Sequence, residues 1–447
     1  MRLSRAAVAV AIEAMSWIEY EGLSERAAFA RAAKQLRVSE RDQLRAAQSL
    51  ILETERRRNF VDFLIQRGLR RQIDFDSLRH GVKSLLRLFC YVAKFQQRGA
   101  NDHLRILEEG RSVLHWKTLH PVETAFGQIL ACDPLEASEL IYDEALALRL
   151  FHPRWFVSAC TSMLGRQMAL QLMRRNLHQA SSYLRINTLR GSEERWLRQV
   201  ESAGIELDKV EGLPLTYRVL SSRRPIVRSR PYREGGIAIQ DKASILAGLV
   251  ASPKPGDRVF DICAAPGAKT SHLAQQMRNN GIIYSVDRSA SRLSFWKDEM
   301  SRLGVQIANP IVADAAKSIP ACTEGDVVVL DPPCSNTGTF WKSPGAKWTI
   351  DRGRIHQIAT TQSAMLENAS KLVRVGGTLL YSTCTILDEE NEYVITRFLR
   401  LNPDFQLVRM NPSIGFPGLY GLDVSRRLYP HTHECNGHFI CRMMRVS

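Results

Sequence analysis

The chain has 447 residues, of which 45% are hydrophobic and 24% are charged. This length is too great for one ordinary hydrophobic core, so it predicts two or three domains, and the composition excludes a disordered or collagen-like protein. No apolar run approaches the ~20 residues that cross a bilayer, which argues against a membrane protein. The formal net charge of +15 favours a polyanionic partner such as a nucleic acid.

The beginning of the chain resembles a secretory signal only superficially. Arg2 and Arg5 precede an apolar run, but Glu13 interrupts that run and a helical pattern continues beyond it. The nine cysteines are odd in number and widely spaced, and none forms a C-x-x-C pair. This usage is typical of reduced thiols rather than of a disulfide framework, so we expect a cytoplasmic protein, which we take to be a monomer.

Residues 1–150 carry apolar side chains three and four positions apart, which predicts an all-α domain. Ser24 and Ser39 are candidate N-caps, and Gly68 is a candidate helix end. The arginine clusters of this region could bind phosphate, but such clusters are more often solvated helix faces, and we prefer that interpretation. The clusters are Arg56–Arg58 and Arg70–Arg71.

Residues 151–234 predict a small α/β domain, RRM-like or ferredoxin-like, that binds RNA. A helix follows "FHPRWF", "SYLRINTL" and "PLTYRVL" have the composition of strands, and "SEERWLRQVESAG" predicts a capped helix that ends at Gly204. The closing stretch "SSRRPIVRSRPYREGG" interleaves arginines with an aromatic side chain, which favours contact with an RNA backbone over a simple linker. The side chains in question are Arg223, Arg224, Arg228, Arg230, Arg233 and Tyr232.

From residue 235 to residue 447 apolar strands alternate with helices. "DRVFDI", "GIIYSVD", "NPIVAD", "GDVVVLDPP" and "GGTLLYSTC" have the composition of strands, and a long helix is expected at 354–373. This rhythm predicts an α/β, doubly wound, Rossmann-like domain with a mainly parallel sheet. Ligands bind such sheets at the carboxyl ends of the strands, so the residues that follow each strand are the candidate site.

The stretch "DICAAPGAKTSHLA" places small side chains between the first of these strands and its helix. It is neither G-x-G-x-x-G nor a P-loop, so a pyrophosphate ligand is poorly supported. Asp287 ends the second strand where an acid accepts hydrogen bonds from a ribose, and Asp314 follows the third. An adenosine compound without pyrophosphate therefore fits, and S-adenosylmethionine is such a compound. The alternative for each aspartate is an ordinary turn or cap.

Two strands end in a cysteine. "VVVLDPPCSNTG" contains Asp331 and Cys334, and "GGTLLYSTCT" contains Cys384. The C5 carbon of cytosine is too weak a nucleophile to attack a methyl sulfonium, unless a thiolate first adds to C6. An acid is needed to stabilise the charge that develops on the N3 and amino edge, and Asp331 is positioned as that acid. These residue types leave open which of the two thiols attacks.

Together these motifs resemble the Nop2/Sun family of RNA cytosine-5 methyltransferases. The resemblance runs from about Tyr183 to the end of the chain. It is carried by "LRINTL", "IQDKAS", "DICAAPGAKT", "SVDRS", "LDPPCSNTGTFWKSPGAKW", "GGTLLYSTCTILDEENE" and "RRLYPHTHECNGHFI". The helical N-terminal region, with "ERD" at 40–42, resembles the NusB-like domain of the Fmu/RsmB branch, which modifies 16S ribosomal RNA.

The resemblance implies that Cys384 is the covalent nucleophile, that Cys334 helps to release the methylated RNA, and that Lys269 lies near Asp331. It also implies an S-adenosylmethionine pocket. Its members would be Cys263, Ala264, Ala265, Pro266, Gly267, Ala268, Lys269, Asp287, Asp314 and Asp331. Two positions depart from the family pattern: Ala268 replaces a glycine, and His438 stands where an aromatic residue commonly precedes Phe439.

Three alternatives remain at this point. The tail "HTHECNGHFIC" has residue types that bind zinc, but it resembles an ordinary terminal hairpin of the family, so we expect no metal. A tRNA substrate is distinguished from ribosomal RNA only by the N-terminal region. A non-catalytic RNA-binding or assembly factor would not need both cysteines and the acid, and we consider that class less favoured.

Overall fold

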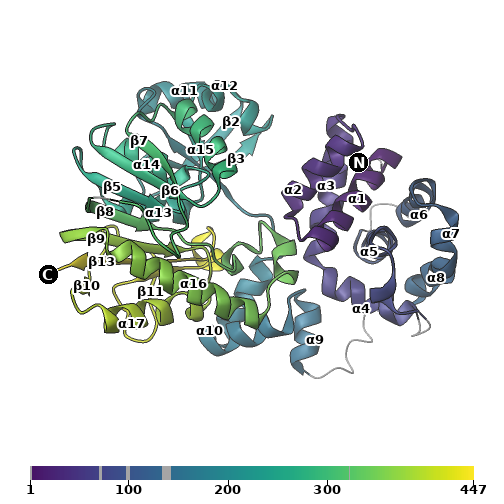
Figure 1. Ribbon diagram of the computed structural model, residues 1–447. Helices are drawn as coiled ribbons and strands as arrows, with labels where there is room; N and C mark the ends of the chain where they lie inside the picture. Colours follow the sequence, from purple (N-terminus) through teal and green to yellow (C-terminus); the bar gives the residue numbers. More distant parts are fainter. Residues whose placement is uncertain (1–2, 70–72, 97–100, 133–141, 322) are drawn as a thin grey trace. The chain divides into compact units, whose positions relative to one another are not determined.

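A computed structural model describes residues 3–69, 73–96, 101–132, 142–321 and 323–447 (Figure 1). The chain divides into two compact units, each made of two stretches of sequence. Unit 1 contains Met1–His178 together with Phe340–Asp351. Unit 2 contains Gln179–Thr339 together with Arg352–Ser447.

Unit 1 is helical throughout its described residues. Alanine, leucine and valine side chains buried on α1 and α5 form the centre of its hydrophobic core, as expected for amphipathic helices. Its helices are α1 (Arg5–Glu21), α2 (Glu25–Gln35), α3 (Arg41–Arg56), α4 (Arg58–Gly68), α5 (His80–Phe95), α6 (Asp102–Val113), α7 (Trp116–Leu119), α8 (Glu123–Ala131), α9 (Tyr142–Arg149) and α10 (Arg154–Arg175).

The helix signals read from the sequence were mostly accurate. Ser24 caps α2 by accepting a hydrogen bond from the backbone amide of Ala27, and α4 ends at Gly68. The N-cap of α3 is Glu40 rather than Ser39, and its side chain makes no capping hydrogen bond. The expected cap was therefore wrong by one position.

The interpretation of Arg56–Arg58 as a solvated helix face was wrong. Arg56 is 5% exposed, and its guanidinium donates to the carbonyl oxygens of Asn176 and Trp341 at 2.8 and 3.3 Å. Arg57 and Arg58 pair with acidic residues of neighbouring turns, and Arg58 also pairs with Glu19 of α1. These arginines hold polar groups inside the helical unit, which sequence spacing does not reveal. The second cluster, Arg70–Arg71, lies outside the described residues.

Unit 1 also includes Phe340–Asp351, which comes from the middle of the second half of the chain. Within this segment the short helix η6 (Pro344–Trp348) is held by four hydrogen bonds to the helical residues. The Gly345 amide donates to the Glu25 carboxylate at 2.5 Å, and the Trp348 indole donates to the Glu55 carbonyl at 2.7 Å. The fully buried Lys347 amine donates to the carbonyls of Arg56 and Phe151 at 2.9 and 2.7 Å.

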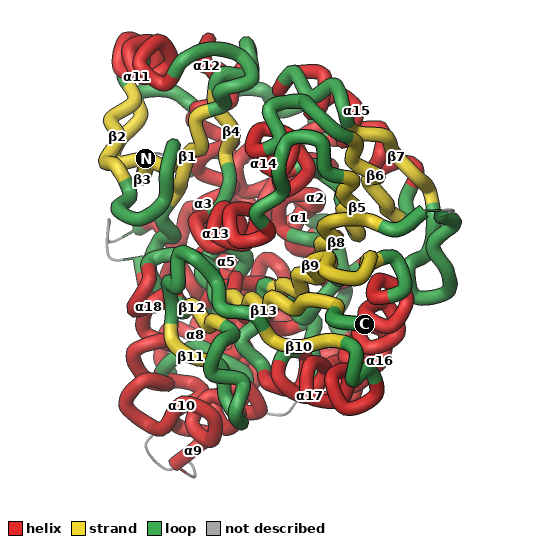
Figure 2. Tube along the Cα trace, turned by 90° about the vertical axis from the view of Figure 1, so that its left-hand side faces the viewer, coloured by secondary structure: helices red, strands yellow, loops and turns green. Residues whose placement is uncertain are grey.

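Unit 2 contains two sheets (Figures 1 and 2). The smaller sheet is antiparallel, with strand order β2-β3-β1-β4, and helix α11 covers it. The strands and the helix expected between residues 182 and 222 are present, whereas β2 was not anticipated, because three of its five residues are charged. The elements are β1 (Ser182–Ile186), α11 (Glu193–Ser202), β2 (Ile205–Lys209), β3 (Thr216–Ser222), α12 (Arg230–Arg233) and β4 (Ile237–Ile239).

A buried arginine joins the smaller sheet to the larger domain of unit 2. Arg185, on β1, is 1% exposed and donates to Gln240 at 3.0 Å and to Ser271 at 2.9 Å, and it also bonds the side chain of Gln275. Burial lowers its pKa to about 9. Ser271 and Gln275 belong to helix α14 (Ala268–Gln276), so the small sheet is fixed to the helix that follows the small-residue loop.

The larger sheet has the order β11-β12-β13-β9-β8-β5-β6-β7, and β10 pairs with β13. Strands β9, β8, β5, β6 and β7 are parallel, and β13 joins antiparallel to β9. The strands are β5 (Arg258–Ile262), β6 (Ile282–Asp287), β7 (Ala308–Val312), β8 (Gly325–Leu330), β9 (Val373–Thr383), β10 (Phe405–Leu407), β11 (Phe416–Pro417), β12 (Arg426–Leu428) and β13 (His438–Arg445).

Both faces of this sheet are covered by helices, as a doubly wound domain requires (Figure 1). On β8, Val327 and Val329 pack with one cluster and Val328 and Leu330 with the other, which explains the unbroken apolar run. The expected Rossmann-like fold is confirmed. The covering helices are α13 (Lys242–Ala251) and α14 on one face, and α16 (Arg352–Ser370) and α17 (Glu392–Leu401) on the other.

We predict that Lys347→Met destabilises the helical unit by about 2 kcal/mol, since it would leave the carbonyls of Arg56 and Phe151 unpaired while keeping most of the side-chain volume. Burial lowers the pKa of Lys347 well below its usual range, and a neutral amine still donates two hydrogen bonds. The measurement is thermal or urea unfolding. The exposed Lys117→Met is the matched control, and equal stability of the two variants would contradict the role assigned to Lys347.

Candidate active site

The candidate site lies at the carboxyl ends of β5 and β8. The chain runs from β5 outward to β6 and β7, then returns to β8 on the other side of β5. The strand order therefore reverses between β5 and β8, and open parallel sheets bind ligands at such a switch point.

The loop that follows β5 is built from small residues that approach their neighbours closely. The Ala264 amide donates to the Val286 carbonyl at 3.0 Å, and the Ala265 amide donates to the Asp287 carboxylate at 3.2 Å. Gly267 has a φ of +110°, and a Cβ there would come within 2.5 Å of the Met300 side chain. The position therefore accepts only glycine, and the loop turns directly into α14.

The two outer aspartates hold backbone in place. Asp287 is 2% exposed and accepts hydrogen bonds from the amides of Ala265 and Ser289, at 3.2 and 3.0 Å, besides pairing with Arg292 at 3.2 Å. Asp314 lies two residues beyond β7, and its carboxylate accepts from the Ala316 amide at 3.1 Å. Asp287 therefore fixes the β5 loop, and Asp314 caps a turn beside the same sheet edge.

Asp261, the fourth residue of β5, was not singled out from the sequence. Its carboxylate accepts a hydrogen bond from Thr270 at 2.5 Å, and Thr270 in turn accepts one from the Trp296 indole at 3.0 Å. Burial raises the pKa of Asp261 to about 6. This chain of contacts ties the start of α14 to the strand that precedes the loop.

Lys269 and Asp331 form an ion pair at the switch point. The Lys269 amine lies 2.5 Å from Oδ2 of Asp331, and the Ser382 hydroxyl lies 3.4 Å from Oδ1. The Asp331 amide donates to the Ile262 carbonyl at 3.2 Å, which sets the turn after β8. Burial alone would lower the pKa of Lys269, but the charge and the hydrogen bond of Asp331 raise it above its usual value. The pair therefore retains a proton.

The two strand-end cysteines meet. The Sγ atoms of Cys334 and Cys384 are 3.1 Å apart, and Sγ of Cys384 lies 2.9 Å from the Asn336 side-chain oxygen. The hydrogen bond with Cys384, followed by burial, raises the pKa of Cys334 well above its usual range. Cys334 therefore remains a protonated thiol at neutral pH.

A buried carboxylate, Glu390, holds the two cysteine loops together. It accepts hydrogen bonds from the Ser335 amide at 2.9 Å, the Thr385 hydroxyl at 2.9 Å and the Gln362 amide at 3.0 Å, and it also accepts from the Ser335 hydroxyl. Ser335 and Thr385 each directly follow one of the cysteines. Glu390 is fully buried, and burial raises its pKa.

Further contacts between the loops leave little freedom. Thr337 and Thr385 share a hydroxyl hydrogen bond of 2.7 Å, and the Gly338 amide donates to the Cys384 carbonyl at 3.1 Å. A Cβ on Gly338 would lie 2.0 Å from the Gly437 carbonyl oxygen, so no larger residue fits. The geometry of the thiols is therefore set by backbone and hydroxyl contacts around them.

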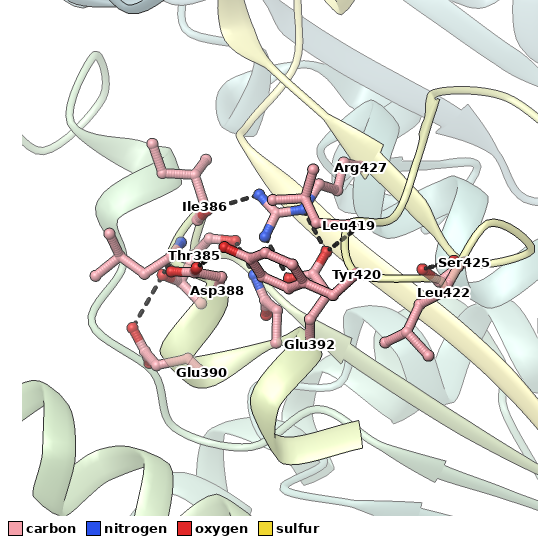
Figure 3. Close-up of polar contacts among 12 residues, drawn as sticks. Thr385, Ile386, Asp388, Glu390, Glu392, Leu419, Tyr420, Leu422, Ser425 and Arg427 are labelled. Carbon is pink, nitrogen blue, oxygen red and sulfur yellow. Dashed lines mark hydrogen bonds and ion pairs between the residues drawn. The ribbon is translucent and has the colours of Figure 1, made fainter. Parts of the chain in front are cut away.

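A buried ion pair stabilises the segment that follows Cys384 (Figure 3). The Arg427 guanidinium contacts the Glu392 carboxylate in a bidentate pair, with one bond of 2.5 Å, and donates to the Ile386 carbonyl at 2.8 Å. Beside it, the Tyr420 hydroxyl donates to Asp388 at 2.6 Å. The "RRLYP" and "DEENE" stretches thus meet around the loop that carries Cys384.

The histidines and cysteines of the tail do not gather. His431 and His433 lie on helix α18 (Pro430–His433), Cys435 lies in the bend that follows, and His438 and Cys441 lie on β13. No group of three metal-ligating side chains occurs in the described part of the chain. His438 is 4% exposed, and burial lowers its pKa to about 4.

No disulfide joins the described cysteines. None of the described helices combines the length and apolar character that a membrane span requires.

A family profile described as 16S rRNA methyltransferase RsmB/F matches residues 248–444, and a profile for the ferredoxin-like domain of RsmF/B-like methyltransferases matches residues 152–220. The probable ribosomal RNA small subunit methyltransferase B of Bacillus subtilis (strain 168) is 31% identical, over 67% of this chain and 68% of its own length. The chain belongs to the RsmB branch of the Nop2/Sun family of RNA cytosine-5 methyltransferases. The resemblance seen in the motifs is thus confirmed.

Other relatives agree with this placement. The human 28S rRNA (cytosine(4447)-C(5))-methyltransferase is 34% identical over 59% of this chain, which corresponds to 34% of its own length. The crystal structure of PH0851 superposes with a TM-score of 0.87 and 28% identity, over 100% of both chains. A methyltransferase homolog protein from Pyrococcus horikoshii superposes with a TM-score of 0.60 and 30% identity, covering 67% of this chain and 97% of its own.

The structure brings most of the expected site residues to one sheet edge. Lys269 pairs with Asp331, Cys334 contacts Cys384, and Cys263–Ala268 form the adjoining loop. Asp314 stands further along the edge, after β7. Sequence reasoning missed the residues that hold the thiols, namely Asn336, Gln362, Thr385 and Glu390. One signal was available: "DEENE" places acids beside a strand end, where a buried carboxylate can accept backbone donors.

We predict that Glu390→Met lowers kcat roughly 10- to 100-fold, because four donors would lose their acceptor and the cysteine loops would loosen. Glu390→Gln should retain more activity, since an amide can accept from Ser335 and Gln362 while donating to the hydroxyls. The neighbouring Glu389→Met is the control. Methyl transfer from labelled cofactor is the measurement, and equal rates for Glu390→Met and Glu389→Met would refute the role of Glu390.

Proposed function

We propose that the protein transfers a methyl group from S-adenosylmethionine to C5 of a cytosine in small-subunit ribosomal RNA, through a covalent bond between Cys384 and C6. Family membership supports the reaction class, and the small-subunit methyltransferase B relatives support the substrate. The observation that carries the mechanism is the 3.1 Å separation of the Cys334 and Cys384 sulfurs, at the sheet edge where Lys269 and Asp331 pair.

The residues at the end of β5 fit S-adenosylmethionine. The loop is lined by small side chains, and α14 begins without a side-chain cap, which leaves its first amides without a side-chain acceptor. We assign the cofactor to Cys263–Lys269 with Asp287, Asp314 and Asp331. Their carboxylates suit hydroxyl groups and a positively charged sulfonium better than a pyrophosphate. When bound, this cofactor supplies an electrophilic methyl group.

In the first step, the Cys384 thiolate adds to C6 of the cytosine. The C5–C6 double bond opens, and negative charge spreads over C5 and the N3 and amino edge. The proton held by the Lys269–Asp331 pair is positioned to stabilise that edge, which is why the high pKa of Lys269 matters. Cys384 loses its thiol proton to water as the Sγ–C6 bond forms, whereas the raised pKa of Cys334 keeps that thiol protonated.

In the second step, C5 would accept the methyl group that the bound cofactor supplies. A base then removes the C5 proton, the C5–C6 double bond forms again, and the Cys384 thiolate leaves. The Cys334 thiol is in hydrogen-bond contact with the departing sulfur, so it can stabilise that thiolate as it forms. We therefore assign Cys334 to product release and Cys384 to attack.

We also propose the organisation of the whole chain. Residues 1–150 would form a NusB-like helical domain, residues 151–234 an RNA-binding α/β domain, and residues 235–447 the catalytic domain. The match of 152–220 to a ferredoxin-like domain profile supports the middle assignment. We propose that the protein acts as a monomer in the cytoplasm and needs no metal.

The mechanism is tested with two cysteine variants. Cys384→Ala is expected to abolish methyl transfer from labelled cofactor, because no nucleophile would activate C5. Cys334→Ala is expected to accumulate a protein–RNA adduct that survives a denaturing gel, since release would be slowed. Cys132→Ala, in the helical unit, is the control and should behave as the wild type. Full turnover by Cys384→Ala, or an adduct formed by that variant, would overturn the assignment.

The substrate is tested by bisulfite sequencing of total RNA from cells with and without the protein. Loss of protection at one cytosine of small-subunit ribosomal RNA is expected, because 5-methylcytosine resists deamination. Re-expression of the wild type, but not of Cys384→Ala, should restore the protection. If protection is lost at a tRNA cytosine while the ribosomal RNA is unchanged, the substrate is a tRNA, and the proposed reaction still holds.

A further inference from the structure

Five arginines converge on one pocket of the smaller α/β part of unit 2. The pocket has a volume of about 430 Å³, which is within the ~300–1,000 Å³ of typical small-molecule sites. Figures 1 and 2 both show α11, β2 and α12 together at this end of the unit. The lining residues are Ser202, Ala203, Gly204, Ile205, Arg223, Arg224, Arg228, Ser229, Arg230 and Arg233.

The charge in the pocket is largely uncompensated. Arg230 pairs with Glu234 at 2.6 Å, whereas Arg224, Arg228 and Arg233 form no ion pair with any described residue. The carboxyl end of α11 points at the pocket and contributes about −0.5 of a charge, far less than the guanidinium groups. A cluster that served only to cap this helix would not need so many arginines. An anionic ligand would account for the surplus of positive charge in the pocket.

The backbone that carries the arginines is ordered by hydrogen bonds. The Arg223 amide donates to the Gly204 carbonyl at 3.2 Å, and the Ser222 hydroxyl donates to the Arg224 carbonyl at 2.5 Å. Ser229 caps α12, and the Arg302 guanidinium lies 3.9 Å from the Tyr232 ring centroid. The backbone from Ser222 to Arg233 is therefore ordered by these contacts and is not a flexible linker.

A second hollow adjoins the first and has a different character. Its volume is about 700 Å³, and it shares Gly204, Ile205 and Arg223 with the arginine pocket. Leucine, valine and tyrosine side chains line it together with Glu201 and Glu206. The two carboxylates disfavour a phosphate there, while the apolar surface suits a base, which can also stack on the guanidinium of Arg223.

We propose that this pair of hollows binds the single-stranded part of the RNA substrate outside the target cytosine, with a backbone phosphate in the arginine pocket and the adjoining base in the second hollow. This rests on the proposed function, since it names a second contact site for the same RNA. Guanidinium groups bind phosphate in a bidentate manner, which favours arginine over lysine at such a site. A splayed base requires a single strand, so duplex RNA should bind less well.

The test compares two triple variants of the full chain. R224Q/R228Q/R233Q removes the unpaired arginines of the pocket, and R397Q/R400Q/R409Q removes three exposed arginines elsewhere in unit 2. Binding of a short labelled single-stranded RNA is followed by fluorescence anisotropy across a salt series. We expect the pocket variant to bind roughly tenfold or more weakly, and its salt slope to fall by about 0.7 for each lost phosphate. The control variant should change by much less.

Other outcomes would overturn the inference. Equal losses in both triple variants would show that only general charge matters, and a larger loss for duplex than for single-stranded RNA would exclude the second hollow. If only binding of poly-L-glutamate fell, an acidic protein segment would be the partner. Thermal unfolding checks that both variants fold.

Methyl transfer separates this inference from the proposed function. The pocket variant should have a raised KM for RNA and an unchanged kcat, because the reacting groups are untouched. A wild-type protein that transferred no methyl group would refute the proposed function, while the binding comparison would still decide the pocket. A pocket variant with normal KM and normal RNA affinity would refute the pocket alone.

Discussion

The active site depends on one buried carboxylate. Glu390 accepts hydrogen bonds from both segments that carry a cysteine, and Gln362 of α16 joins the same oxygen atoms. Two parallel strands bring their ends to one edge, but they do not by themselves place two sulfur atoms 3.1 Å apart. An acceptor with several lone pairs between the loops does so, since a buried carboxylate is costly unless every oxygen is satisfied. Chemistry at the thiols is therefore supported by a residue that takes no part in it.

The sequence predicted much of this arrangement, because hydrophobic periodicity and the residues that follow each strand can be recognised within short segments of the chain. The alternation of strands and helices indicated the doubly wound sheet, and an acid, a thiol or a small-residue loop after each strand indicated the site edge. What it could not show depends on contacts between distant residues. Arg56 looked like part of a solvated cluster but donates to the carbonyls of Asn176 and Trp341, and the charged strand β2 is formed by pairing with β3. The roles of Glu390 and Asn336 have the same origin, because only the folded chain brings their partners together.

The charged side chains near the thiols differ from those of the arginine pocket in burial and in pairing. Near the thiols, positive charge is scarce and paired: Lys269 is 7% exposed and bonded to Asp331, so its proton is directed at a single place. In the stretch between β3 and β4, the pocket arginines are exposed and mostly without ion-pair partners among the described residues. The first arrangement suits proton placement during a reaction, and the second suits capture of a flexible polyanion. Arg185 connects the two regions through α14, so a ligand on either part bears on the same helix.

The interrupted sequence of unit 1 has a consequence for biosynthesis. Its helices are translated first, but Phe340–Asp351, whose Lys347 and Trp348 bond to the helical residues Arg56 and Glu55, is made about 160 residues after His178, which takes roughly 10–30 s at ordinary elongation rates. Until then Glu25 and the carbonyls of Glu55 and Arg56 lack their native partners. The helical bundle can be finished only once the ribosome has passed the codon for Asp351, and by then Gln179–Thr339, the longer of the two stretches of unit 2, has already been translated.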